Sequence, residues 1–228
     1  MLSLIGAVGV GAATAAAHGA FYRNSPVFGR VQGRLSTAGR EVALTFDDGP
    51  NPRATPRILD TLRELGLHAT FFMLGRHVER WPQLARRVAE EGHGIGNHGY
   101  HHRRLHARGP AYTRLDMQLG TQVIGEATGV APPYFRAPHG FRNPWVGGIA
   151  RELGQRVVGW TLGVWDTDRP GADVIAQRVR RGARPGCIVL LHDGDACDAD
   201  GDRLQTADAL PLIIRDLRAS GFRFGLLS

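Results

Sequence analysis

The sequence predicts an α/β fold, a distorted (β/α) barrel of about seven parallel strands preceded by a short apolar N-terminal segment. From residue 41 onward, short apolar runs alternate with amphipathic stretches of helical spacing. Such alternation is typical of a mainly parallel sheet. Polar clusters also follow directly on several expected strands. In parallel α/β folds, functional residues gather at that edge of the sheet.

Seven strands and six helices are expected in this region. The apolar runs place strands near residues 42–46, 69–74, 94–97, 134–136, 156–161, 187–192 and 222–225. Helical spacing and composition predict helices at 52–65, 78–91, 111–128, 144–153, 172–181 and 204–220. A glycine stands at or just after the end of most of these helices, as helix C-termini favour.

Length and composition indicate one globular domain with a short extra segment. The chain has 228 residues, of which 43% are hydrophobic and 21% are charged. Single domains commonly reach this size, and the composition is far from that of disordered chains. No internal repeat is present. We therefore divide the chain into an N-terminal segment, residues 1–40, and one folded domain, residues 41–228.

The charge balance is basic, with a net charge of +7, and all 28 basic residues are arginine. A basic surface attracts nucleic acid, anionic membranes or acidic cell-wall polymers. The arginine pairs lack the interleaved aromatic residues that stack on single-stranded bases. We therefore expect no nucleic-acid partner, and we predict no oligomeric state.

The N-terminal segment resembles an export or membrane-anchor segment. Residues 2–17 carry no charge and are rich in Ala, Gly, Val and Leu. No basic residue precedes this run, and it is shorter than the roughly 20 residues of a full span. Basic residues follow it instead. We expect membrane association through residues 2–17 and a domain outside the cytoplasm. The alternative is a flexible or helical soluble extension.

The two cysteines, Cys187 and Cys197, fit neither a metal knuckle nor a disulfide-dense scaffold. We expect Cys187 to be buried in an apolar strand and Cys197 to lie in a loop. A disulfide between them is the alternative for an exported chain. The acidic run 193–202 is expected to be a solvated loop, with groove shaping or cation binding as the alternative.

The strongest chemical pattern combines adjacent carboxylates with paired histidines. Asp47 and Asp48 follow the first strand and precede a Gly-Pro turn. His98 and His102 have a spacing that places both imidazoles on one face of a helical turn. One carboxylate and two imidazoles with an open position describe a catalytic zinc-type site, which zinc, cobalt or manganese would suit.

Other histidines compete for this role or stand apart from it. His101 and His106 are alternative ligands, because a spacing of three from His98 also places His101 on a nearby face. His68, His77 and His93 have no partner at ligand spacing. We expect these three to be surface or helix-capping residues.

Together these motifs resemble those of the carbohydrate esterase family 4 polysaccharide deacetylases, which share the NodB homology domain, over about residues 41–226. Residues 45–50 match the first motif in full, and His98 with His102 matches the second with Gly99 in place of Ser or Thr. Residues 136–140 match the third, with His139 at a usually aromatic position. In the fourth, Trp160 and Asp166 are in register, but Gly163 and Thr167 replace an expected Asp and Trp. Residues 188–193 match the last.

The resemblance assigns a role to each of these residues. Asp47 is expected to be the general base, with Arg136 holding it ionised, and His192 the catalytic acid, with Asp166 keeping it protonated. One divalent metal ion is expected on Asp48, His98 and His102, with zinc as the first choice and cobalt or manganese as alternatives. Substrate binding is assigned to His139 through its backbone N–H, to Trp160 and to Leu190.

The activity implied by the resemblance is metal-dependent hydrolysis of N-acetyl groups. The substrate would be a polysaccharide containing N-acetylglucosamine, such as peptidoglycan or chitin-like oligomers, and acetate would be released. Residues 41–228 would then be the catalytic domain, and an acidic cell-wall glycan would suit a basic exported enzyme. One alternative is a catalytically silent glycan-binding relative. The other is a hydrolase of a different amide or of an acetyl ester.

Overall fold

The computed structural model, which describes residues 2–37 and 39–228, confirms the distorted (β/α) barrel. The strands pair in the order β5-β4-β3-β2-β1-β7-β6, β8 pairs with β1, and every pairing between these strands is parallel. The strands are β1 (Glu41–Asp47), β2 (Thr70–Met73), β3 (Gly94–Asn97), β4 (Tyr134–Phe135), β5 (Arg156–Val157), β6 (Leu162–Gly163), β7 (Cys187–His192) and β8 (Arg223–Phe224).

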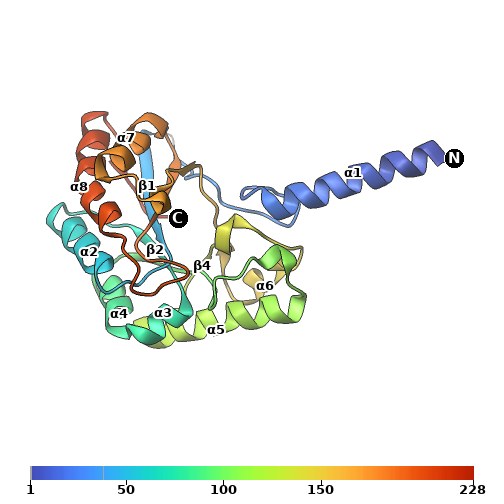
Figure 1. Cartoon of the computed structure of the whole chain (residues 1–228), viewed down its shortest axis with the longest axis horizontal. Helices are drawn as coiled ribbons and strands as arrows, with labels where there is room; N and C mark the ends of the chain where they lie inside the picture. The colour runs from blue at the N-terminus through green and yellow to red at the C-terminus, as the bar shows by residue number, and fades with distance from the viewer. Residues whose placement is uncertain (1, 38) are drawn as a thin grey trace.

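Helices surround this sheet, and one helix projects from it (Figure 1). Helix α1 (Leu2–Phe21) points away from the body of the molecule. The others are α2 (Ala54–Glu64), α3 (Gly75–Arg80), α4 (Pro82–Glu90), α5 (Pro110–Thr128), α6 (Val146–Glu152), α7 (Ala172–Gly182) and α8 (Leu204–Ala219). Three short 3-10 turns, η1 (Leu105–Ala107), η2 (Pro138–Gly140) and η3 (Asp166–Asp168), lie in loops after strands.

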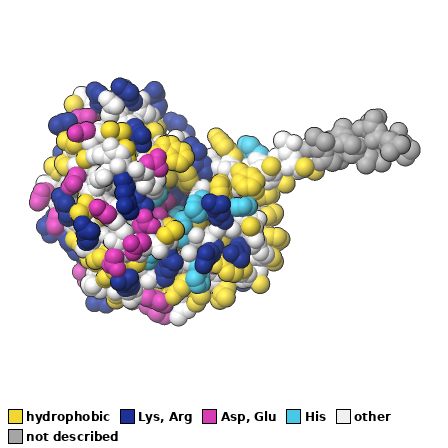
Figure 2. Space-filling model, in the orientation of Figure 1, with side chains coloured by type: hydrophobic (Ala, Val, Ile, Leu, Met, Phe, Trp, Pro, Cys, Tyr) yellow, Lys and Arg dark blue, Asp and Glu magenta, His cyan; other side chains and the backbone are white. Residues whose placement is uncertain are grey.

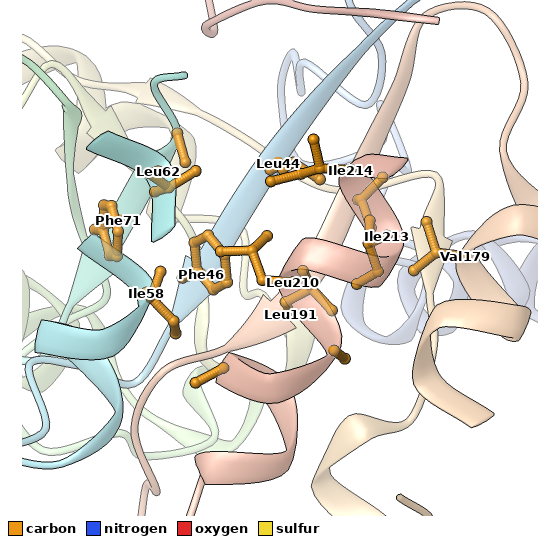
Figure 3. Packing of buried hydrophobic residues seen from close by; sticks show 14 of the residues in the cluster. Leu44, Phe46, Ile58, Leu62, Phe71, Val179, Leu191, Leu210, Ile213 and Ile214 are labelled. Carbon is orange, nitrogen blue, oxygen red and sulfur yellow. The ribbon is translucent and has the colours of Figure 1, made fainter. Parts of the chain in front are cut away.

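The main core lies between the central strands and helices α2, α7 and α8. Strands β1 and β7 are adjacent in the sheet and almost entirely buried, which explains why both read as continuous apolar runs. In Figure 3, Phe46 of β1 lies between Ile58 of α2 and Leu210 of α8, and Leu44 of β1 lies near Ile214 of α8. This packing fixes the end of β1, where Asp47 stands.

All seven expected strands are present, and β6 is an additional one that the sequence analysis missed. Its two residues pair with Val189 and Leu190 of β7, and a run this short has no readable periodicity. The helix expected at 78–91 is two helices, because Pro82 begins α4 immediately after Trp81. Proline lacks a backbone N–H and favours the first position of a helix.

The segment that follows α1 packs against the barrel. The backbone N–H of Arg142 donates to the carbonyl of Ala20 (3.0 Å), and Gln32 forms a bridge with Val158 beside β5. Arg34 forms another bridge with Cys187 of β7. The segment thus connects the β5 end of the strand order with β7, the strand next to its other end, and packed structure extends well before residue 41. No helix within residues 2–37 and 39–228 has both the length and the hydropathy needed to cross a bilayer.

The cysteines lie as expected from the apolar pattern. Cys187 is buried at the start of β7, Cys197 is exposed in the following loop, and both are free thiols.

Candidate active site

The site lies at the carboxyl ends of the parallel strands. Asp47 and His192 are register partners at the ends of β1 and β7. Asn97, the last residue of β3, pairs with Phe135 at the end of β4. His98 and Arg136 follow directly on these two residues, so four strands place their polar side chains at one edge. Histidines and acidic residues gather around the hollow in the middle of this face (Figure 2).

Asp48, His98 and His102 form a three-residue group whose ligand atoms all lie within 4.8 Å of one another. Nε2 of His102 is 3.2 Å and Nε2 of His98 is 3.4 Å from Oδ1 of Asp48. This carboxylate oxygen is buried and has no hydrogen-bond partner. An unpaired buried carboxylate oxygen facing two imidazoles is costly without a cation. The donor set therefore fits one divalent metal ion.

The two imidazoles are neutral, as metal ligands must be. Burial and the neighbouring His102 hold the pKa of His98 well below its usual range. Burial, with the charge of His192, lowers the pKa of His102 to about 3. Nδ1 of His98 lies 2.7 Å from the carbonyl oxygen of Arg136 and donates to it, which leaves the lone pair of Nε2 facing Asp48.

The competing histidines do not reach this group. Nδ1 of His101 is 2.8 Å from Asp116, and His106 packs against Phe141, with 5.1 Å between ring centroids. The geometry therefore supports His102 as the partner of His98. The backbone of Asp48 and of His102 is left-handed, with φ of 72° and 58°, which is strained for residues other than glycine.

A buried carboxylate from α5 supports the loop that carries the ligands. Asp116 is 1% exposed and accepts hydrogen bonds from the backbone N–H groups of Tyr100 (3.2 Å) and His101 (3.0 Å). Gly99 has a φ of 79°, and a Cβ atom placed there would lie 2.4 Å from Oδ2 of Asp116. Asp116 therefore occupies the space into which a side chain at position 99 would extend.

Asp47 is buried and paired with a buried arginine. Nη1 of Arg136 donates to Oδ1 of Asp47 at 2.6 Å and to Thr45 at 2.9 Å. Nη2 of Arg136 donates to the carbonyl of Gly159 (3.0 Å). Burial raises the pKa of Asp47 to about 6, although the charge of Arg136 partly offsets this effect. A carboxylate with a pKa near neutrality suits general-base chemistry.

His192 and Asp166 form a second charged pair. Nδ1 of His192 is 2.9 Å from Oδ1 of Asp166, whose other oxygen accepts from the backbone N–H of His192 (2.8 Å) and from Thr206 (2.9 Å). Burial lowers the pKa of His192, but the Asp166 carboxylate outweighs it, and the resulting pKa is about 9. His192 is therefore a cation at neutral pH.

The three residues assigned to substrate binding surround these pairs. The ring of His139 lies 4.5 Å from that of His102 between centroids. The ring of Trp160 lies 5.8 Å from the guanidinium carbon of Arg136. Leu190 is buried within β7, beside Thr45 and Gly163. Their roles in binding stay predictions.

Two histidines expected to be surface or helix-capping residues are buried in the structure, which corrects the sequence analysis. Nδ1 of His77 lies 2.7 Å from the carbonyl oxygen of Asp48, and this side chain belongs to the buried face of α3. His93 packs against Phe71, with 5.3 Å between ring centroids; His68 is exposed as expected. His77 thus holds the backbone of a candidate ligand, and only the apolar neighbours Leu74 and Val78 hinted at its burial.

Comparison with known proteins agrees with this geometry. Residues 34–158 match the family model described as "Polysaccharide deacetylase". A peptidoglycan-N-acetylglucosamine deacetylase from Bacillus cereus is 40% identical over 82% of this chain and 86% of its own length. A chitooligosaccharide deacetylase from Rhizobium leguminosarum bv. trifolii is 42% identical over 80% of this chain and 88% of its own length.

Solved structures share the fold as well as the sequence pattern. The crystal structure of a peptidoglycan N-acetylglucosamine deacetylase superimposes with a TM-score of 0.81 and 34% identity, over 86% of this chain and 90% of that one. The family model covers more than half of the chain, and the ligand group lies where the family motifs place it. The chain therefore belongs to the polysaccharide deacetylase family and is a metal-dependent carbohydrate esterase.

Proposed function

We propose that the enzyme removes acetyl groups from N-acetylglucosamine residues of peptidoglycan or chitin-like glycans and releases acetate. The observation that carries this proposal is the convergence of Asp47, His192 and the three candidate ligands at one edge of the barrel. The relatives named for these two glycans support the substrate class. Zinc is the proposed metal, because neutral imidazoles and one carboxylate form its preferred catalytic set.

The bound cation would supply Lewis-acid polarisation of the acetyl carbonyl and would acidify the attacking water. Asp47 accepts the proton of that water, and its burial gives it the basicity to do so. Arg136 fixes the direction of the Asp47 carboxylate by its 2.6 Å hydrogen bond. The backbone N–H of His139 is proposed to donate to the oxyanion that develops.

His192 completes the reaction at the leaving group. An amine is a poor leaving group unless it is protonated as the C–N bond breaks. His192 is a cation at neutral pH and can donate from Nε2, because Nδ1 is engaged by Asp166. The proton therefore passes from a preformed imidazolium to the departing sugar amine.

Location is proposed from the N-terminal segment. We propose that the enzyme acts outside the cytoplasm and that residues 2–17 direct its export or hold it at the membrane. The support is that this uncharged helix projects from the body and that residues 11–18 are exposed. An uncharged, apolar helix that projects from a folded domain suits a membrane surface or an export machinery.

Acetate release tests the proposed function. Purified enzyme is incubated with N-acetylglucosamine oligomers and with peptidoglycan, before and after chelation and after divalent metals are restored. Chelator-sensitive release that zinc restores is the expected result. Absence of release from both substrates, with one metal bound per chain, would contradict the proposal and favour another amide, an acetyl ester or a silent glycan-binding protein.

A further inference from the structure

A row of rings runs from the candidate metal site toward the base of α1. The centroid of His139 lies 4.5 Å from that of His102, and Phe141 lies 5.8 Å beyond His139. Phe21, the last residue of α1, lies 5.4 Å from Phe141. The ring of His106 packs against both Phe21 and Phe141, and its centroid lies 4.9 Å from that of Phe21. We call His139, Phe141 and Phe21 the ring row.

The two ends of the ring row are open to solvent despite these contacts, and Phe141 between them is half-buried. Phe21 is 56% exposed although two rings touch it, and His139 is also exposed. Large exposed aromatic side chains that adjoin a site are unusual on a soluble domain and mark places where ligands or partners bind. The core does not need these ring faces, so another molecule is expected to cover them.

Hydrogen bonds fix the backbone beneath the row. Arg142 is 1% exposed, and it binds the carbonyl of Ala20 through its backbone N–H (3.0 Å) and that of Ser25 through its side chain (2.5 Å). Nδ1 of His18 lies 2.8 Å from the hydroxyl of Ser25. Phe21 therefore belongs to a helix end that is held on the barrel by hydrogen bonds. A preordered surface loses little freedom on binding.

We propose that the ring row is a platform on which the sugar residues next to the acetylated sugar stack. This inference rests on the proposed function, since it names how a glycan continues beyond the reacting residue. A pyranose ring presents apolar C–H faces and polar edges, so it packs on an aromatic ring while its hydroxyl groups stay hydrated. Each ring-to-ring step is comparable to the length of one sugar in a β-1,4-linked chain.

The geometry favours a glycan over a lipid surface at Phe21. An aromatic residue at the end of an apolar helix can also lie at the headgroup level of a membrane. Phe21, however, packs against Phe141, and the row continues without interruption to a candidate metal ligand. The platform predicts a preference for long substrates, because a short one reaches the metal site without reaching Phe21.

The test compares N-acetylglucosamine hexamer with dimer, using the full chain. The Phe21→Ala variant is expected to raise KM for the hexamer about five- to tenfold, the loss expected for one aromatic stacking contact. Its kcat for the hexamer should stay within about twofold, because Phe21 is the row's farthest ring from the reacting atoms. Phe21→Tyr keeps the ring and should keep the KM. Leu115→Ala, on α5 and 55% exposed, is the matched control.

Binding measured without turnover separates this inference from the proposed function. Calorimetry with the Asp47→Asn chain should show that adding Phe21→Ala weakens hexamer binding by a similar factor. If the parent chain releases no acetate from any oligomer, the proposed function fails, while this binding comparison still decides the platform. Where Phe21→Ala does not fold, Phe21→Leu keeps the apolar contact and removes the flat ring.

A hexamer KM and affinity that remain unchanged in folded Phe21 variants would overturn the platform. If the same variants also bind phosphatidylglycerol vesicles less tightly, the exposed ring is assigned to a membrane surface instead.

Discussion

Replacing Asp166 with Asn should shift the pH dependence of turnover toward acid. Asp166 contacts His192 twice, at 2.9 Å to Nδ1 and at 2.8 Å to the backbone N–H. Asparagine has the same shape but no charge, so the variant keeps the packing and removes the interaction that holds the proton on His192. Asp47 and Asp48 also favour the cation, but each contributes less than Asp166.

The structure gives the size of this effect. Asp166 makes the largest contributions that favour the cation, so without it the pKa of His192 should fall from about 9 toward its ordinary 6.5. The difference corresponds to about 3 kcal/mol. At pH 8 the protonated fraction falls from about nine-tenths to a few per cent, so kcat should fall about thirtyfold.

The assay is the pH profile of acetate release with saturating metal. The alkaline limb of kcat should lie near pH 9 in the native enzyme and should shift toward pH 6.5 in the variant. Asp168→Asn makes the same chemical change at an exposed position of the same 3-10 turn and should leave the limb in place. An Asp166→Asn enzyme whose alkaline limb stays near pH 9 would refute the reasoning.

The same pair makes a signed contribution to folding stability. The pKa of His192 is raised in the folded state, so its stabilisation is fully present below about pH 6.5 and disappears as pH rises through about 9. The pKa of Asp166 is lowered, despite burial, by His192, so its contribution is lost only in acid. The melting temperature of the native protein should therefore fall between pH 7 and pH 10, and that of Asp166→Asn should fall less.

Three further predictions concern the metal site and the N-terminal segment. Asp47→Asn should reduce kcat at least about a hundredfold and keep the metal, whereas His98→Ala should lose the metal. Atomic emission measures the metal content of both variants. An unchanged metal content in His98→Ala would show that the ligands are misassigned. His77→Ala leaves the carbonyl of Asp48 unpaired, which should lower the free energy of unfolding by about 1–3 kcal/mol, as measured by thermal melting. The variant should also bind the metal about tenfold or more weakly in a competitive chelator titration. Equal metal affinity would exclude a positioning role for His77. A chain that starts at residue 18 should keep the native melting temperature. A chain that starts at residue 41 loses the bridges to Val158 and Cys187 and should melt several degrees lower. Equal melting temperatures of the two chains would mean that residues 18–40 contribute nothing to the stability of the barrel.

The sequence predicted the barrel because its central strands are buried on both faces. Strands β1, β2 and β7 are nearly fully buried, so each reads as an apolar run between turn residues. Strand β6 has only two residues, both half-buried, and its existence depends on pairing with β7. Such a strand is a consequence of the fold, and no local sequence pattern predicts it.

The site residues that directly follow a strand could be predicted from the sequence. The residues that support them from a distant helix could not. Asp47, Asp48 and His192 could be placed because parallel strands end at one edge. His77 contacts Asp48 across 29 positions of the chain, and Asp116 contacts Tyr100 across 16. Neither contact leaves a spacing signal, because each depends on how a helix packs against the sheet.

Gly99 shows why a missing motif residue does not imply a weakened site. The family motif has a Ser or Thr between the two histidines, where this chain has Gly99. In this chain the left-handed backbone of Gly99 lets Asp116 approach to where a side chain would otherwise stand. Asp116 then accepts two backbone hydrogen bonds from the ligand loop. A carboxylate on α5 thus supports the ligand loop, and a side chain at position 99 would collide with it, because the added Cβ atom would lie 2.4 Å from Oδ2 of Asp116.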